Sequence, residues 1–137
     1  MRIRNFVIDT NILVSAALMP HSLPNKALKR AYRSGEIAVS EDTLEELSEV
    51  LYRRKFDKYF VGDERLGFIS RLEKNSSLFL PEINLTICRD PKDNKFLELA
   101  VAAKASCIIT GDEDLLALNP FRGIPIVNAS DFLNMKF

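Results

Sequence analysis

Short apolar runs rich in β-branched residues alternate along the chain with longer segments whose apolar residues recur at helical spacing. Parallel strands can only be joined through crossover connections, which are usually helices. The alternation therefore predicts an α/β fold, a three-layer α/β/α sandwich of Rossmann-like type with a central parallel sheet. The expected strands are residues 3–8, 37–39, 106–109 and 124–127.

Capping residues and prolines mark where the helices begin. Ser40 is a candidate N-cap for a helix that closes near Arg53, and Asp90-Pro91 starts another helix after the middle of the chain. Asp63 can cap a further helix, with Leu66 among its buried positions. Shorter helices are expected over 11–18, 24–32 and around 115–116. Of two short strand candidates, 78–80 and 85–87, either could enter the sheet, and Pro125 places the last strand at an edge.

Size and composition fit one soluble domain spanning residues 1–137, because 47% of the residues are hydrophobic and 28% are charged. Nineteen Lys and Arg balance 19 Asp and Glu, so no global field attracts nucleic acid or an anionic membrane. The apolar run 12–19 is too short to cross a membrane, and residues 1–10 lack the layout of a signal peptide. We expect a cytoplasmic protein without membrane association.

Cys88 and Cys107 have no CxxC spacing and are expected to be buried and inert.

Acidic residues follow the predicted strands where a ligand site of an open parallel sheet would form, at the carboxyl ends of the strands. Asp9 terminates the first strand, Asp112 follows strand 106–109, and Asp93 lies in the first turn of the helix after Asp90-Pro91. Glu46 joins them from the helix that Ser40 caps, because it borders the apolar stripe whereas its acidic neighbours point away. We expect these four side chains to converge.

Converging carboxylates raise one another's pKa and destabilise the fold unless cations neutralise them, so this arrangement predicts a metal site. An oxygen-only ligand set favours Mg²⁺ or Mn²⁺, and His21, the single histidine, cannot form a His-rich site. Such a site suits phosphodiester hydrolysis, in which an ion activates water and stabilises charge on the phosphate. Asn11 and Thr110 are candidates to orient the carboxylates.

Each acid taken alone also has a purely structural interpretation. Asp93 can be an N3 carboxylate under an Asp90 cap, and Asp112 and Asp114 can be turn residues beside Gly111. Asp9 is harder to explain in this way, because it lies between an apolar strand and an apolar helix. The order of all four acids against the strand ends favours a functional site.

Four blocks, in order and covering the whole chain, resemble the PIN domain family. They run from Phe6 to Asn11, Leu44 to Leu47, Asp90 to Leu97 and Ile109 to Leu116. The resemblance is closest to the prokaryotic branch that forms toxin components of toxin–antitoxin systems, and the chain is similar to VapC-type toxins. One block alone is weak evidence, whereas the ordered set is specific.

This resemblance implies a metal-dependent, single-strand-specific endoribonuclease, a phosphodiester hydrolase that binds RNA. Its acidic quartet, both catalytic and metal-binding, would be Asp9, Glu46, Asp93 and Asp112, with Asp114 as a further metal ligand and Asp90 as an auxiliary acid. The resemblance also implies an α/β/α sandwich that commonly dimerises, and a toxin inhibited by an antitoxin that occupies the active-site groove.

Contacts to RNA phosphates must come from local cations, because the chain has no basic excess. The candidates are Arg53, Arg54, Lys55, Arg89, Lys92 and Lys95. The first three can equally be solvated residues at a helix end. Four aromatic residues beside them can stack on bases, contact a second copy or lie in the core, and we favour the core for at least half of them. These are Tyr52, Phe56, Tyr59 and Phe60.

Three alternative functions remain. Haloacid-dehalogenase-like phosphatases need a second acid two residues after the nucleophilic aspartate, where this chain has Asn11. A response-regulator receiver domain needs an acidic pair near the end of the first strand, which the chain lacks. The third is a catalytically silent PIN-like module that binds RNA or protein. Such modules usually lose acids, whereas all four are present here, and metal-dependent stabilisation separates the two cases.

Overall fold

Five parallel strands form the central sheet of the computed structural model, which describes residues 3–137. Their order is β3-β2-β1-β4-β5, and each neighbouring pair runs parallel. The strands are β1 (Asn5–Ile8), β2 (Glu36–Val39), β3 (Ser76–Leu78), β4 (Cys107–Ile109) and β5 (Ile126–Val127). The predicted α/β fold with a central parallel sheet is confirmed.

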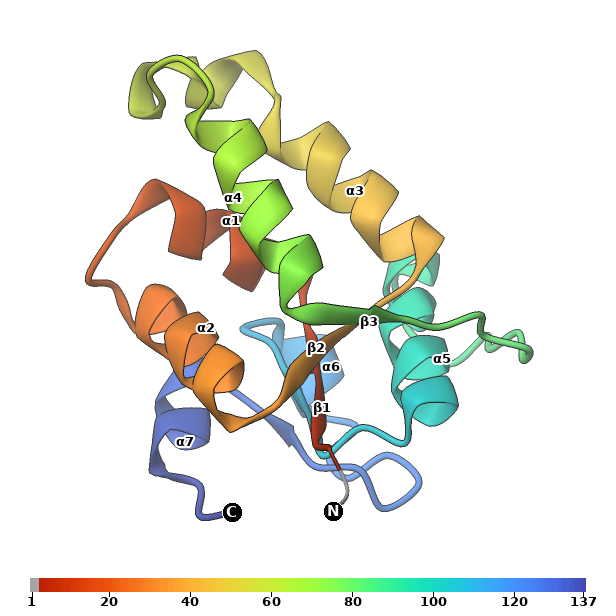
Figure 1. Cartoon of the computed structure of the whole chain (residues 1–137). Coiled ribbons are helices and arrows are strands. Elements are labelled where there is room, and N and C mark those ends of the chain that lie inside the picture. Colours follow the sequence, from red (N-terminus) through yellow and green to blue (C-terminus); the bar gives the residue numbers. More distant parts are fainter. Residues whose placement is uncertain (1–2) are drawn as a thin grey trace.

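Helices cover both faces of this sheet, and strand residues alternate between the two (Figure 1). Phe6 and Ile8 of β1 pack into one core with five helices, whereas Val7 between them faces the other core with two helices. The first core takes α1 (Thr10–Leu18), α2 (Leu23–Ser34), α3 (Glu41–Leu51), α4 (Glu64–Lys74) and α7 (Ala129–Asn134). The second takes α5 (Asn94–Ala103) and α6 (Glu113–Leu116).

Side-chain caps start the helices that leave the carboxyl ends of the strands. Asp9 accepts from the backbone of Asn11 at the start of α1. Ser40 caps α3, as predicted, and forms a reciprocal capping box with Thr43. Asp112 caps α6 by accepting from the backbone of Asp114. Two of the predicted site acids therefore also fix how the chain turns from strand to helix.

Two 3₁₀ helices differ from the sequence-based expectations. The segment after Asp90 begins with η2 (Pro91–Asp93), and the α-helix starts only at Asn94. The helix from Ser40 ends at Leu51 instead of near Arg53, and η1 (Arg54–Tyr59) follows it.

Helix α7 was not predicted, although its cap, Asn128, accepts from the backbone of Asp131. It places Phe132 in the first core, with its ring centroid 5.3 Å from that of Phe6.

Two other expectations are wrong, and the choice between the two strand candidates is decided, because β3 (Ser76–Leu78) overlaps residues 78–80. Leu66 is 56% exposed. Residues six positions apart lie about 120° apart around the axis of an α-helix, so Leu66 does not share the face that buries Leu72. Residues 85–87 form no strand, since the backbone N–H groups of Leu85 and Ile87 bond to side chains of α5. Cys88 is partly exposed, whereas Cys107 is buried as predicted, and both are free thiols.

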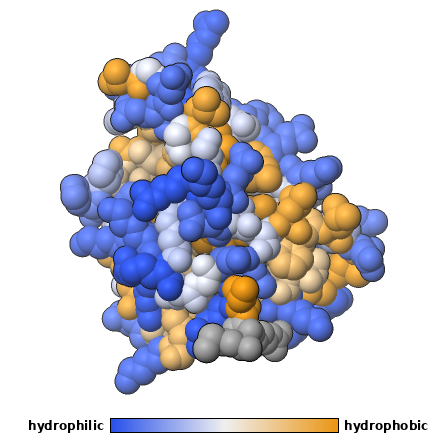
Figure 2. Space-filling view, viewed as in Figure 1, coloured by the Kyte–Doolittle hydropathy of each residue, from blue (hydrophilic) through white to orange (hydrophobic). Residues whose placement is uncertain are grey.

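The two edges of the sheet differ in character. Strand β5 lies at one edge, as Pro125 predicted, and β3 lies at the other. Beyond β3 the chain exposes apolar side chains, with Leu80 74% exposed, and Figure 2 shows them gathered on the right of a mostly hydrophilic face. Across residues 3–137, no helix has the length and apolar character that crossing a membrane requires.

Candidate active site

The carboxyl ends of β1 and β4 bring Asp9 and Asp112 to one edge of the sheet, because the two strands are adjacent and parallel. Asp93 reaches this edge from η2, and Glu46 reaches it from α3. Asp9, Glu46 and Asp93 line one cavity of about 730 Å³. Asp112 lies outside the lining of this cavity, but its charge acts on both Asp9 and Asp93.

Asp9 is the most buried of the predicted acids, with 4% of its surface exposed. Its Oδ2 accepts from Thr110 Oγ1 at 2.7 Å, and its Oδ1 accepts from the backbone N–H of Asn11 at 3.3 Å. Burial raises the pKa of Asp9, the two hydrogen bonds oppose this rise, and the charges of Asp112 and Glu46 add to it. The carboxylate is held in one orientation at an energetic cost.

The Thr110 hydroxyl links two of the acids. It donates to Asp9 and also accepts from the backbone N–H of Asp112 at 3.0 Å. Thr110 itself is fully buried, so water does not compete for these two hydrogen bonds. We expected Thr110 and Asn11 to orient carboxylates. The structure places the Thr110 side chain and the Asn11 backbone in contact with Asp9, and it gives the Asn11 side chain no such contact.

Asp93 shows the electrostatic cost of gathering these acids. Partial burial raises its pKa from 3.8 to about 6, and the negative charges of Asp112, Asp9 and Asp90 contribute to the rise. Asp90 is exposed, and its Oδ1 accepts from the backbone N–H of Lys92 at 3.0 Å. The acids therefore form one electrostatically coupled group.

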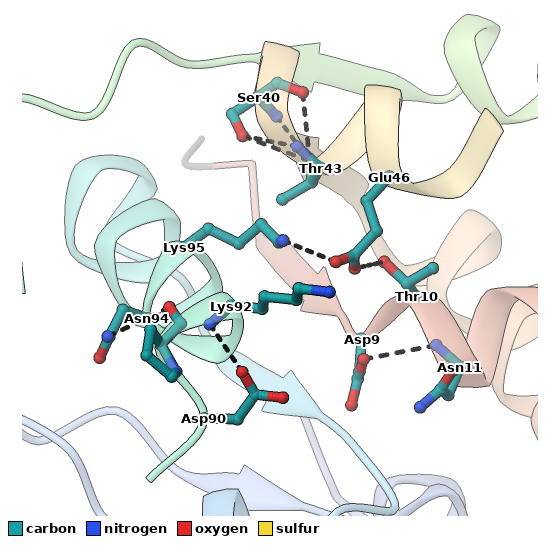
Figure 3. Close-up of polar contacts among 11 residues, drawn as sticks. Asp9, Thr10, Asn11, Ser40, Thr43, Glu46, Asp90, Lys92, Asn94 and Lys95 are labelled. Carbon is teal, nitrogen blue, oxygen red and sulfur yellow. Dashed lines mark hydrogen bonds and ion pairs between the residues drawn. The ribbon is translucent and has the colours of Figure 1, made fainter. Parts of the chain in front are cut away.

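Glu46 is half-buried whereas Glu45 and Glu49 are exposed, as the helical periodicity predicted. Its two oxygens have different partners (Figure 3). Oε1 accepts from Thr10 Oγ1 at 2.5 Å, and Oε2 pairs with Lys95 Nζ at 2.6 Å. Thr10 was not among the predicted site residues, and only its position beside Asp9 pointed to the site.

The donor set fits a hard divalent cation, because it consists of carboxylate oxygens alone. Within residues 3–137, however, no three His, Cys, Asp or Glu side chains stand ready as ligands of one ion. Glu46 is engaged by Lys95. Asp114 is exposed, and within residues 3–137 it bonds only through its backbone N–H, which donates to Asp112 Oδ1 at 2.8 Å. The proposed metal ligands stay a prediction.

The predicted RNA-binding cations separate into two groups. Arg53, Lys92 and Lys95 line the cavity together with the acids, and the Lys92 side chain points toward the space between Glu46 and Asp9 (Figure 3). Arg54, Lys55 and Arg89 are exposed outside its lining. Of the nearby aromatic residues, Phe56 and Phe60 pack against the first core, whereas Tyr52 and Tyr59 are about half exposed.

Asn94 is a supporting residue that was not predicted from the sequence. It is 8% exposed, and its Oδ1 accepts from the backbone N–H groups of Ile87 and Cys88, at 3.0 and 2.9 Å. These bonds tie the irregular segment before Asp90 to the start of α5. The acids Asp90 and Asp93 follow directly, so Asn94 fixes the part of the chain that carries them.

Two solved structures share this fold. The VapBC2 complex of Rickettsia felis, solved with a DNA fragment from its promoter, contains a chain that superposes with a TM-score of 0.61 at 16% identity. The match covers 90% of this chain and 98% of that chain. A protein from Pyrobaculum aerophilum superposes with a TM-score of 0.60 at 14% identity, covering 96% of this chain and 88% of that chain.

Sequence comparison identifies the family. An uncharacterized protein of Methanocaldococcus jannaschii is 35% identical over 114 residues, which cover 82% of this chain and 73% of that protein. The family model of the PIN domain matches residues 5–114, the part that contains β1 to β4 and all the acids described above. The chain therefore belongs to the PIN domain family.

Proposed function

We propose that this chain is a divalent-metal-dependent endoribonuclease that hydrolyses single-stranded RNA. PIN domains are generally nucleases and generally use divalent metal ions. One observation carries the proposal for this chain: the Asp9 carboxylate is buried at the sheet edge under the charges of Asp112 and Glu46. Such an arrangement destabilises a fold unless a cation is bound, so it favours a functional role over a structural one.

Asp9, Asp93, Asp112 and Glu46 would hold Mg²⁺ or Mn²⁺, with Asp114 as a further ligand at the exposed side. When bound, the ion supplies activation of water and neutralisation of charge on the phosphate. The chain's contribution is orientation. Thr110 and the Asn11 backbone hold Asp9 in place, and Asp112 is fixed by its own cap on α6.

Cations near the acids would position the substrate. Arg53 follows α3 and Lys92 lies in η2, and both line the cavity that contains Asp9. We assign them contacts to RNA phosphates. Lys95 lines the same cavity, and Arg54, Lys55 and Arg89 extend the cationic surface outside it. Asp9 is nearly inaccessible, so a phosphate must enter the cavity, and a flexible single strand can do this more readily than a duplex.

We further propose that the chain is the toxin of a type II toxin–antitoxin system and acts in the cytoplasm as a homodimer. The VapBC2 complex of similar fold supports this role, together with membership of the PIN family. Induced expression of wild type should arrest growth, and induced expression of Asp9→Asn should not. The proposal also predicts an adjacent gene whose co-expression restores growth. Light scattering of the purified chain measures the dimer.

A substrate panel tests the nuclease. Wild type and Asp9→Asn are each incubated with single-stranded RNA, duplex RNA and single-stranded DNA, in Mn²⁺, Mg²⁺ or excess EDTA. Metal-dependent cleavage of single-stranded RNA by wild type alone is expected. If no substrate is cut and neither ion raises the melting temperature, the chain is instead a catalytically silent PIN module.

A further inference from the structure

Lys95 occupies an unfavourable position for a cation. It lies in the first turn of α5, where the positive end of the helix dipole repels an ammonium group. Its side chain is only 18% exposed, and its Nζ lies 2.6 Å from Glu46 Oε2. The attraction of Glu46, on a different helix, therefore offsets a local repulsion and draws Lys95 into the acidic cavity.

Glu46 is engaged on both sides in this arrangement. Thr10, which is buried directly after Asp9, donates to Oε1 at 2.5 Å, while Lys95 holds Oε2. The charge of Glu46 is thus neutralised from within the chain, and neither of its oxygens lacks a protein partner. Figure 3 shows the ammonium group of Lys95 beside the carboxylate, on the side of the cavity formed by α5.

The pairing of Glu46 with Lys95 bears on how the predicted acids are arranged as metal ligands. Within the described part of the chain, no three acidic side chains are arranged around one point. A cation that neutralises Glu46 is nevertheless present, and it is an ammonium group. A divalent ion that takes a Glu46 oxygen as a ligand has to compete with Lys95 for the charge of that carboxylate.

We propose that Lys95 is an internal counterion that competes with the divalent cation for Glu46 and so lowers the ion affinity of the site. The inference rests on the proposed function, because it concerns the ion of the nuclease. It makes Lys95 a positioning residue, which acts on the ion through Glu46. The resting site is stabilised by the pair, and ion binding requires that the pair open.

Ion affinity tests the proposal without any measurement of activity. Calorimetric titration with Mn²⁺ is performed on wild type, Lys95→Met and Glu46→Gln, and on Glu46→Gln combined with Lys95→Met or with Lys92→Met. Lys92→Met is the matched control, because Lys92 lines the same cavity and has no ion pair among residues 3–137. Both lysine variants remove one positive charge from the same cavity, so the effect of general electrostatics is similar in the two.

The expected result is that Lys95→Met binds Mn²⁺ at least about fivefold more tightly than Lys92→Met, which corresponds to about 1 kcal/mol. In the Glu46→Gln background, replacing Lys95 should add no more than replacing Lys92 does. In EDTA, Lys95→Met should also melt at a lower temperature than wild type, because Glu46 loses its counterion. Lys95→Gln serves as a second variant if Lys95→Met does not fold.

Equal affinities of the Lys95 and Lys92 variants, or an effect of Lys95 that persists without Glu46, would overturn the proposal. In that case metal-dependent cleavage by wild type would leave the nuclease assignment intact. If wild type binds neither Mn²⁺ nor Mg²⁺, both the nuclease assignment and this inference fail.

Discussion

Replacing Thr110 by valine removes one hydroxyl group from the centre of the site with almost no change in shape. That hydroxyl donates to Asp9 Oδ2 at 2.7 Å and accepts from the Asp112 backbone N–H at 3.0 Å. Both Thr110 and Asp9 are buried, so water cannot replace the lost donor. A hydrogen bond to a charged group contributes about 1.5–3 kcal/mol, and a neutral one about 1 kcal/mol. We expect Thr110→Val to lower the free energy of unfolding by about 2–3 kcal/mol at pH 8 in EDTA.

The loss should depend on pH, because the Thr110 hydrogen bond lowers the pKa of Asp9 while burial raises it. The pKa of Asp9 in the folded chain lies above its unfolded value, so the folded state binds more protons and Asp9 lowers stability as pH rises. Removing the hydroxyl raises the folded pKa further. The destabilisation is therefore largest where Asp9 is ionised, and it should shrink to about 1 kcal/mol where Asp9 is protonated.

Urea unfolding followed by circular dichroism, in a pH series from pH 8 down to the acid limit of the folded state, measures this difference. In the Asp9→Asn background position 9 has no carboxylate to ionise, so the Thr110→Val loss should be the same throughout the series. A loss in the wild-type background that stays equally large across the whole series would show that Thr110 does not act through the Asp9 charge.

Three further outcomes follow from single residues. Burial and neighbouring charges raise the pKa of Asp93 to about 6, so Asp93→Asn should stabilise the ion-free chain by about 1 kcal/mol at pH 8, after allowance for solvent screening. In thermal unfolding this gain should vanish below about pH 4, and a variant less stable than wild type at pH 8 would contradict the prediction. Phe132→Ala should cost about 3–5 kcal/mol in urea unfolding, because the ring is fully buried, and a cost under about 1 kcal/mol would mean that α7 does not close the core. Burial raises the pKa of Cys88 to about 11 and that of Cys107 to about 12. A thiol reagent at pH 8 should therefore modify Cys88 slowly and Cys107 only after unfolding, and fast labelling of Cys107 in the folded chain would contradict its burial.

The parallel sheet and the place of the acids could be predicted because they depend on local patterns. An apolar strand that ends in Asp9 and another that leads to Asp112 share an edge once both strands run parallel. Glu46 followed from helical periodicity, which identifies the semi-buried position on a helix. These inferences need no knowledge of how one helix sits against another.

The ion pair between Glu46 and Lys95 could not be predicted in this way. The two residues lie 49 positions apart, and their contact depends on how α3 and α5 pack at the sheet edge. Lys95 alone was typical of a cation that contacts phosphate. The conformation of the segment before Asp90 could not be predicted either. Its backbone N–H groups at Ile87 and Cys88 donate to the side chain of Asn94 and not to a neighbouring strand. Helix α7 had a local signature in its Asn128 cap, but six residues are too few for a clear periodicity.

In the proposed function, the acids at the sheet edge cut RNA with a divalent ion. The most direct measurement is the initial rate of cleavage of one end-labelled single-stranded RNA in Mn²⁺ by wild type, Asp9→Asn and Glu49→Gln. Glu49 is the control, because it is an exposed acid that lines the same cavity but lies outside the proposed ligand set. We predict that Asp9→Asn loses cleavage by at least about a hundredfold, whereas Glu49→Gln stays within about twofold of wild type. Equal rates for Asp9→Asn and wild type would show that Asp9 takes no part in cleavage.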